Sequence, residues 1–150
     1  MISTELIQKL REQTGAGMMD IKKALEEARG DEKKTLELLR KKGQKIAAKK
    51  QAEREANEGI VEAYVHANKK TATLVQLTCE TDFVAKNEEF QELAHDIAMQ
   101  VTAMNPESKT DLLNQQFIKD SSKTVNDLIV EKIAKLGEKI EIKKIARISF

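Results

Sequence analysis

The spacing of apolar side chains along the chain switches between a helical period and a period of two. Between residues 88 and 104 the apolar positions recur at helical spacing, the strongest periodic signal in the sequence, and predict an amphipathic helix. Asn87, followed by two glutamates, is a typical N-cap, and Pro106 closes the segment. The predicted apolar stripe consists of Phe90, Leu93, Ala94, Ile97, Ala98 and Val101.

The N-terminal part of the chain predicts three short helices. The first starts after the N-cap residue Ser3 and is broken at Gly15, and the second stops at Gly30. The third is capped by Asp31 and is expected to end before Gly43. Because three short helices make only a marginal core, this unit is expected to be a tethered module.

The second half of the chain predicts an α+β fold. Residues 60–67 and 71–79 alternate apolar and polar positions across a short polar link, which is typical of a β-hairpin. A helix over residues 124–136 and a last strand over residues 139–150 follow, so we expect a three-stranded antiparallel sheet with helices against one side. The alternation places Val61, Ala63 and Val65 on one strand face, Thr73, Val75, Leu77 and Cys79 on another, and Ile140, Ile142, Ala146, Ile148 and Phe150 on the third.

These patterns divide the chain into three predicted parts. Residues 1–43 form the three-helix domain, residues 44–57 a basic connecting helix that is polar almost all round, and residues 58–150 the α+β core. Charge follows a similar division, because residues 1–57 carry 14 Lys and Arg against 10 Asp and Glu, whereas residues 58–106 carry 3 against 8. The basic arm and the acidic middle are therefore expected to face different surroundings.

Composition limits the class of protein. No apolar run exceeds three residues, so neither a membrane span nor a signal peptide is expected. The single cysteine, Cys79, favours a reducing compartment, and we expect a cytoplasmic protein. Aromatic residues make up only 3% of the chain, so the core must consist mainly of aliphatic side chains.

Few residues suggest chemistry of their own. The two histidines, His66 and His95, and Cys79 do not cluster in the sequence, which argues against a zinc site; the histidines are expected at the surface and the thiol in the core. The chain lacks the glycine motifs that bind phosphates, so no nucleotide, other cofactor or metal is expected. Glu80 and Asp82 lie two positions apart at a strand end, where an acidic pair is more often solvated than catalytic. We therefore expect that the protein is not an enzyme.

The run RKKGQKIAAKK (residues 40–50) has two interpretations. Lys and Arg could contact the phosphates of a nucleic acid. Alternatively, the run is a solvated helix that an i,i+4 pair between Lys49 and Glu53 stabilises, and the absence of interleaved aromatic residues favours this interpretation. The cations are Arg40, Lys41, Lys42, Lys45, Lys49 and Lys50.

The stretch TCETDFVAKNEEF also has two interpretations. A helix unbroken from Thr81 would place Phe83 seven residues before Phe90, on the same buried face, and periodicity alone favours this. If the helix instead restarts after Asn87, the residues before it form a separate turn and Phe83 need not join the stripe. In TGAGMMD, Met18 fits a core stripe, whereas Met19 is either an exposed contact or half-buried.

Four stretches together resemble the elongation factor Ts family: ELIQKLREQTGAGMMDIKKALEEARGD (5–31), KIAAKK (45–50), TCETDFVAKN (78–87) and IAKLGEKIEIKKIARI (133–148). The resemblance implies an N-terminal ubiquitin-associated-like domain and a core with an antiparallel sheet. It also implies guanine nucleotide exchange on elongation factor Tu, GDP-bound and nucleotide-free, without catalytic chemistry, membrane binding or a specific nucleic acid partner. A ribosome- or RNA-associated protein that uses the basic helix is the alternative.

The resemblance also implies which residues meet the partner. The turn after the second strand would enter the GTPase near its magnesium site, and the N-terminal domain would grip the nucleotide-binding domain. Longer family members carry a duplicated core that this sequence lacks, and the short members pair as homodimers, which is expected here too. The residues carried over are Thr81, Asp82, Phe83 and Val84 in the turn, and Met18, Met19 and Lys22 in the N-terminal domain.

Overall fold

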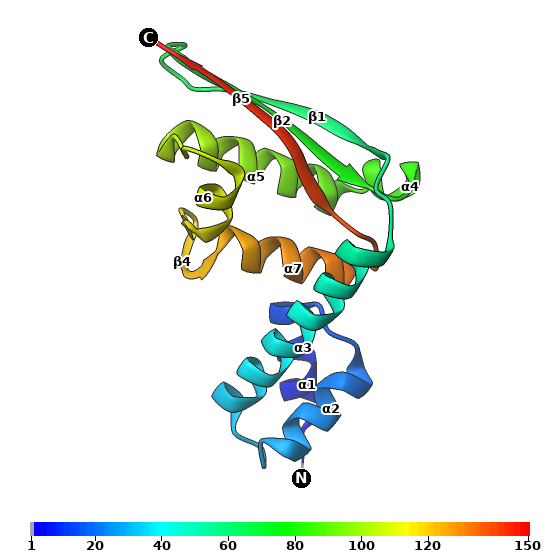
Figure 1. The fold of residues 1–150 in the computed structure, drawn as a ribbon. Helices are drawn as coiled ribbons and strands as arrows, with labels where there is room; N and C mark the ends of the chain where they lie inside the picture. Colours follow the sequence, from blue (N-terminus) through cyan, green and yellow to red (C-terminus); the bar gives the residue numbers. More distant parts are fainter. Residues whose placement is uncertain (1) are drawn as a thin grey trace.

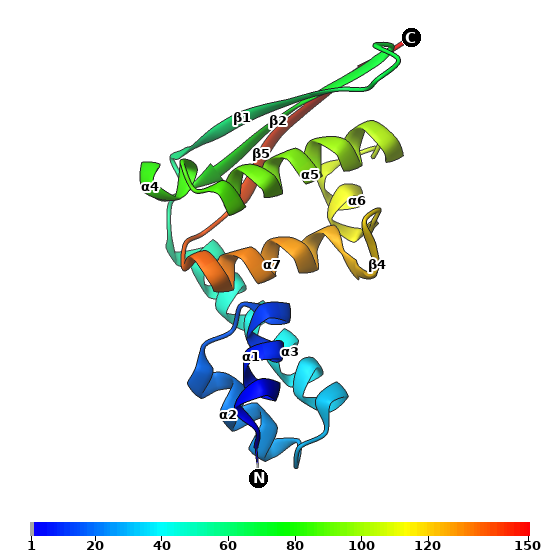
Figure 2. The same ribbon diagram turned by 180° about the vertical axis from the view of Figure 1, so that it is seen from behind.

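The computed structural model describes residues 2–150 and shows a helical unit and an α+β unit joined by one long helix (Figure 1). The sheet, α5 and α7 follow one another as layers, and the N-terminal helices lie below α7 (Figures 1 and 2). The elements are α1 Thr4–Thr14, α2 Met18–Glu27, α3 Glu32–Glu53, β1 Glu58–Val65, β2 Thr71–Cys79, α4 Asp82–Ala85, α5 Glu88–Met104, α6 Lys109–Asn114, β3 Gln116–Phe117, β4 Asp120–Thr124, α7 Val125–Leu136 and β5 Glu141–Ser149.

The first three helices enclose a small hydrophobic cluster of their own. Ser3 caps α1 by accepting a hydrogen bond from the Leu6 backbone N–H, and Gly15 ends the helix in the left-handed region. The arrangement fits the expected ubiquitin-associated-like domain. Its buried residues are Ile7, Leu10, Ile21, Ala24, Leu25 and Leu39.

The expected helix end at Gly43 is wrong, because α3 continues to Glu53. Gly43 instead permits close packing, since a Cβ atom there would lie 3.4 Å from Cγ1 of Val130 on α7. Four residues further on, Ala47 is buried in the core of the α+β unit. The predicted connecting helix is thus the C-terminal part of α3, and the division of the chain at residues 43 and 57 stays a prediction.

The predicted α+β class and three-stranded antiparallel sheet are confirmed. The strand order is β1-β2-β5, and α5 packs against one face of the sheet (Figure 2). The β2 side chains predicted to share a face are all buried, from Thr73 to Cys79. The helix predicted over residues 88–104 coincides with α5, and its stripe from Phe90 to Val101 lies in the core.

The prediction that one face of the last strand runs from Ile140 to Phe150 is wrong. A β-bulge lies between the β2 positions Gln76 and Leu77: Gln76 pairs with Lys144 and Leu77 with Ile142, so Lys143 is an additional residue in β5. Side chains after the bulge therefore change sides, and Ile148 is 79% exposed. The outer sheet face that results, opposite α5, comprises Val61, Ala63 and Val65 of β1, Ala72 and Leu74 of β2, and Ala146 and Ile148 of β5.

The helix α6 and a short hairpin, β3–β4, connect α5 to α7. Gln100 of α5 holds this hairpin, because its side chain donates to the Gln116 carbonyl and accepts from the Ile118 N–H. Lys119 in the hairpin turn donates to Asp96 of α5 at 2.8 Å. In the part of the chain that the structure describes, no helix has the length and apolar character required to traverse a lipid bilayer.

Candidate partner-binding site

The turn between β2 and α5 is a separate short helix, α4, so the second interpretation of this stretch is confirmed. Thr81 has an extended backbone and accepts a hydrogen bond from the Val84 N–H, which makes it the N-cap of α4. Asn87 caps α5 in the same way, with its side chain accepting from the Glu89 N–H at 2.8 Å. Because the helix restarts there, Phe83 lies off the core stripe and is 82% exposed.

The underside of α4 is fixed to the core while its tip faces solvent. Ala85 is buried and Val84 packs against the core at its edge. The buried Cys79 thiol donates to the Thr81 carbonyl at 3.1 Å. Phe83 is therefore presented on an ordered support, whereas an aromatic side chain is usually buried in a fold of this kind.

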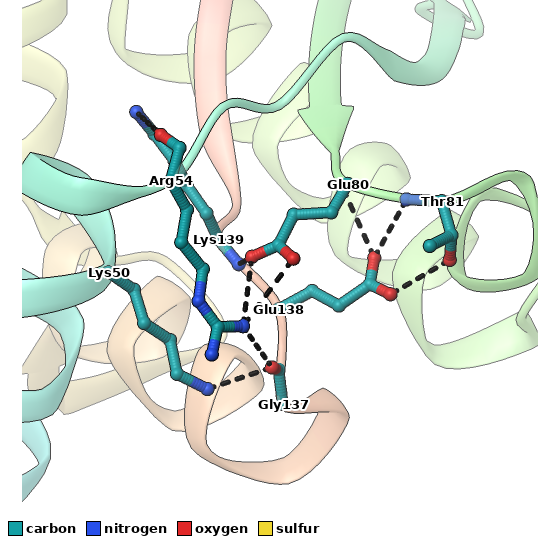
Figure 3. A network of polar contacts seen from close by, with 7 residues as sticks. All are labelled: Lys50, Arg54, Glu80, Thr81, Gly137, Glu138 and Lys139. Carbon is teal, nitrogen blue, oxygen red and sulfur yellow. Dashed lines mark hydrogen bonds and ion pairs between the residues drawn. The ribbon is translucent and has the colours of Figure 1, made fainter.

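A network of polar contacts joins α4 to the link between α7 and β5 (Figure 3). One carboxylate oxygen of Glu138, Oε1, accepts from the Glu80 N–H at 3.1 Å and from the Thr81 N–H at 3.0 Å. The other, Oε2, accepts from the Thr81 hydroxyl at 2.8 Å. Three donors at the start of the turn thus converge on one side chain.

The same network reaches the end of α3. Glu80 accepts from the Lys139 N–H at 2.7 Å and from the Arg54 guanidinium at 3.3 Å. Lys50 and Arg54 both donate to the Gly137 carbonyl, at 2.8 and 3.4 Å. Segments distant in the sequence are therefore tied together beside α4, as Figure 3 shows.

Burial and charge shift the acidity of two groups here. Burial alone would raise the pKa of the Glu80 carboxyl, but the Lys139 N–H and the Arg54 guanidinium outweigh burial and lower that pKa. Burial, with the Glu138 charge as a second cause, raises the pKa of the Cys79 thiol to about 11. Cys79 is thus a neutral, buried thiol as predicted and lacks the thiolate character of a nucleophile.

The N-terminal candidates lie at the start of α2. Met19 is 63% exposed and Lys22 is also exposed. The expectation that Met18 joins the core stripe is wrong, because it is the first residue of α2 and is 49% exposed. In Figures 1 and 2, α2 and α4 lie on the same side of the long axis of the molecule.

The basic run lies in the middle of α3, where Gly43 and Ala47 pack inward and most of the cations are exposed. The expected Lys49–Glu53 ion pair does not form among the described residues, since two exposed side chains gain little from such a pair. Lys42 instead pairs with Asp20, and Lys50 belongs to the network beside α4. The other cations, Arg40, Lys41, Lys45 and Lys49, are exposed.

Other candidate sites offer less. His66 and His95 are exposed, as expected, and within residues 2–150 no three metal-ligating side chains gather. A groove of about 630 Å³ lies between the α1–α2 turn, α3 and α7, and its lining carries both signs of charge. Sequence reasoning missed Glu138, Arg54 and Lys139; the only local signal was Gly137, which marks a helix end and a turn of the chain.

Comparison with known proteins identifies relatives over nearly the whole chain. A family model described as Elongation factor TS matches residues 80–150. Elongation factor Ts of Carboxydothermus hydrogenoformans is 42% identical over 192 aligned residues, which cover 98% of this chain and 88% of the relative. Elongation factor Ts of Desulforamulus reducens is also 42% identical, covering 97% and 88%.

A longer relative is similar to this chain over about half of its own length. Elongation factor Ts of Clostridium botulinum is 48% identical over 149 residues, which cover 99% of this chain but 48% of the relative. The chain thus spans about half the length of this relative. The alignments to the two shorter relatives are also longer than the 150 residues of this chain, so those proteins carry additional segments.

Proposed function

The chain belongs to the elongation factor Ts family of translation elongation factors, and from this premise we propose that it releases GDP from elongation factor Tu. In this proposal α4 enters the partner near its magnesium and phosphate site. The exposure of Phe83 on an ordered support carries the proposal, because the side chain is held out of its own core and is available to another protein.

An exchange factor acts through linked equilibria. Whatever affinity the nucleotide loses when the factor is bound, the factor loses when the nucleotide is bound. Burying one Phe side chain contributes roughly 1.5–3 kcal/mol, which corresponds to one to two decades in affinity. Because α4 is already ordered in the free chain, little of this energy is lost in fixing its conformation.

Each residue of the turn has a proposed role. Phe83 is the wedge, and Val84 anchors the turn on the core beside it. Thr81 caps α4, and Asp82 in its first turn hydrogen-bonds across the contact. Displacing the magnesium ion removes the positive charge that neutralises the phosphates, so the nucleotide binds more weakly.

A second contact is proposed for the N-terminal domain. Met18 and Met19 offer exposed, adaptable apolar surface at the start of α2, and Lys22 adds a charge one turn away. The positions of α2 and α4 on one side of the molecule support contact with a single partner (Figure 1). This contact would grip the nucleotide-binding domain while α4 acts at the phosphates.

We further propose that the chain pairs with a second copy through the outer sheet face. Val61, Val65 and Leu74 are 50–65% exposed there, and an apolar sheet face of this extent favours coverage by another chain. A two-fold axis would bring the same face of each copy together.

Release of labelled GDP from elongation factor Tu tests the exchange function. The rate is measured in excess unlabelled GDP, with no factor and with increasing concentrations of this chain. We expect the release rate to rise with the concentration of this chain and to saturate once all of the elongation factor Tu is bound to it. A release rate that does not depend on the concentration of this chain would overturn the proposal. If the chain instead bound RNA, with an affinity that falls steeply as the salt concentration rises, the basic part of α3 would be favoured as the functional element.

A further inference from the structure

We propose that Glu138 is a positioning residue, which holds α4 in the orientation that presents Phe83 to the partner. This inference rests on the proposed exchange function and adds a residue to it. Glu138 lies 55 positions after Phe83 in the sequence, and it acts on α4 through Thr81 and the backbone of residue 80.

The contacts of Glu138 are directional. Two consecutive backbone N–H groups and one hydroxyl donate to its carboxylate, at 2.8 to 3.1 Å. The hydroxyl of Thr81 also accepts from the Val84 N–H, so the carboxylate orients the same oxygen that caps α4. Hydrogen bonds to an ionised acceptor are about twice as strong as those between neutral groups.

α4 needs such external support because it is very short. A helix of four residues has too few internal hydrogen bonds to offset its nucleation cost. Beneath it, Ala85 and the Cys79 thiol fix its position along the strand end. Glu138 adds the contact on the side of the α7–β5 link (Figure 3), and together these contacts hold the turn that carries Phe83.

The same link joins α4 to the helix that carries the N-terminal domain. Arg54, just after α3, binds Glu80, and the Lys139 ammonium donates to the backbone carbonyls of Gln51 and Arg54. Glu80 and Lys139 thus connect the end of α3 to the start of α4, and Glu138 lies beside this connection through its contact with the Glu80 N–H.

The test uses the full chain with Glu138→Ala and Glu138→Gln, and Glu53→Gln as the matched control. Glu53 is an exposed carboxylate in the last turn of α3, outside the network. GDP release from elongation factor Tu is measured over a range of factor concentrations, with variants shown to be folded by circular dichroism. For Glu138→Ala we expect the saturating rate to fall on the order of ten-fold while the half-saturating concentration changes less.

We expect Glu138→Gln to recover part of the rate, because the amide oxygen still accepts from the two backbone N–H groups. The control should behave as the unmodified chain. A residue that only stabilised the fold would lower the urea midpoint but leave the saturating rate of the folded protein unchanged. That result, or an equal loss for Glu53→Gln, would overturn the proposal.

Amide hydrogen exchange of the free chain separates this inference from the exchange function. The N–H groups of Ala85, Lys86 and Asn87 bond within α4 and make no contact with Glu138. In Glu138→Ala we expect them to exchange on the order of ten-fold faster, and in Glu53→Gln at the original rate. Unchanged protection in Glu138→Ala overturns the positioning role, whereas failure of the unmodified chain to release GDP overturns only the proposed function.

Discussion

At the scale of single residues, Phe83 has the role in recognition that we propose and, because its side chain is exposed, little role in folding. Its ring is 82% exposed, while Phe90, seven residues later, is fully buried. Substitutions at exposed positions of this kind usually change the free energy of unfolding by less than about 0.5 kcal/mol. A loss of function at Phe83 can therefore be separated from a loss of structure.

For Phe83→Ala we expect an unchanged urea midpoint and GDP release from elongation factor Tu that is slower by roughly ten-fold, because the buried wedge is lost. Met104→Ala is the matched control, since Met104 is an exposed apolar residue at the far end of α5. Unfolding of the Phe83 variant, or exchange at the original rate, would contradict the wedge role.

The Glu80 carboxyl makes the free energy of unfolding depend on pH. Its folded-state pKa lies below the usual value of 4.5, so the stabilisation is fully present above that value and is lost as the pH falls through the lower folded-state pKa. Urea midpoints at about pH 6 and about pH 3 should show Glu80→Gln less stable than the unmodified chain at the higher pH, and the difference should shrink in acid. An equal difference at both pH values would exclude this origin.

At the scale of elements, one glycine brings the N-terminal domain against α7. Gly15 ends α1 with φ +68°, and a Cβ atom there would lie 2.9 Å from Cβ of Lys135 and 3.1 Å from the Glu131 carbonyl oxygen. Gly30 has a similar φ of +81°, but a Cβ atom there meets nothing within 4 Å. The two positions thus share the same backbone conformation and differ in their contact with a second element.

Alanine at these two positions separates backbone strain from packing. Gly30→Ala should lower the free energy of unfolding by about 1 kcal/mol, the cost of the left-handed region for a residue with a Cβ atom. Gly15→Ala should cost more, because α1 and α7 must also move apart. Urea denaturation measures both, and equal losses would show that the contact with α7 contributes no stability.

The elements that the sequence predicted best are those whose periodicity reflects burial directly. The bounds of α5 and β2 agree with the prediction because one helix stripe and one strand face are buried along their whole length. The continuity of α3 through Gly43 and the bulge at Lys143 depend instead on contacts with distant segments, Val130 and β2. Local patterns carry no information on such contacts.

The candidate site likewise has features that local patterns could predict and features that depend on distant contacts. Asn87 as an N-cap already indicated a separate turn, and the structure has one. The exposure of Phe83 could not be decided, because helical spacing from Phe90 alone places it in the core. Glu138 was not foreseeable, since its partners lie 57 and 58 positions away in the sequence.

At the scale of the whole molecule, the outer sheet face is the surface through which we propose that the chain pairs. α5 covers one side of the sheet (Figure 2), and the other side carries apolar side chains from all three strands. In this chain a second copy is the occupant that we propose.

Light scattering should therefore give twice the chain mass of 16.9 kDa at micromolar concentration. Leu74→Lys places a charge at the middle of the outer sheet face and should give the monomer, because a buried unpaired ammonium is costly. Met104→Lys, which adds the same charge elsewhere on the surface, should leave the dimer intact. A monomeric unmodified chain would exclude the pairing.

The additional residue in β5, Lys143, determines which side chains of the rest of the strand lie on each face of the sheet. Removing Lys143 would rotate everything after it by half a turn, so that Ile148 pointed inward and Arg147, which now binds the Thr102 carbonyl, pointed outward. A single deletion would thereby replace Lys144, Ala146 and Ile148 on the outer sheet face by Ile145, Arg147 and Ser149. One residue in β5 thus decides which side chains the outer sheet face would offer to a second copy.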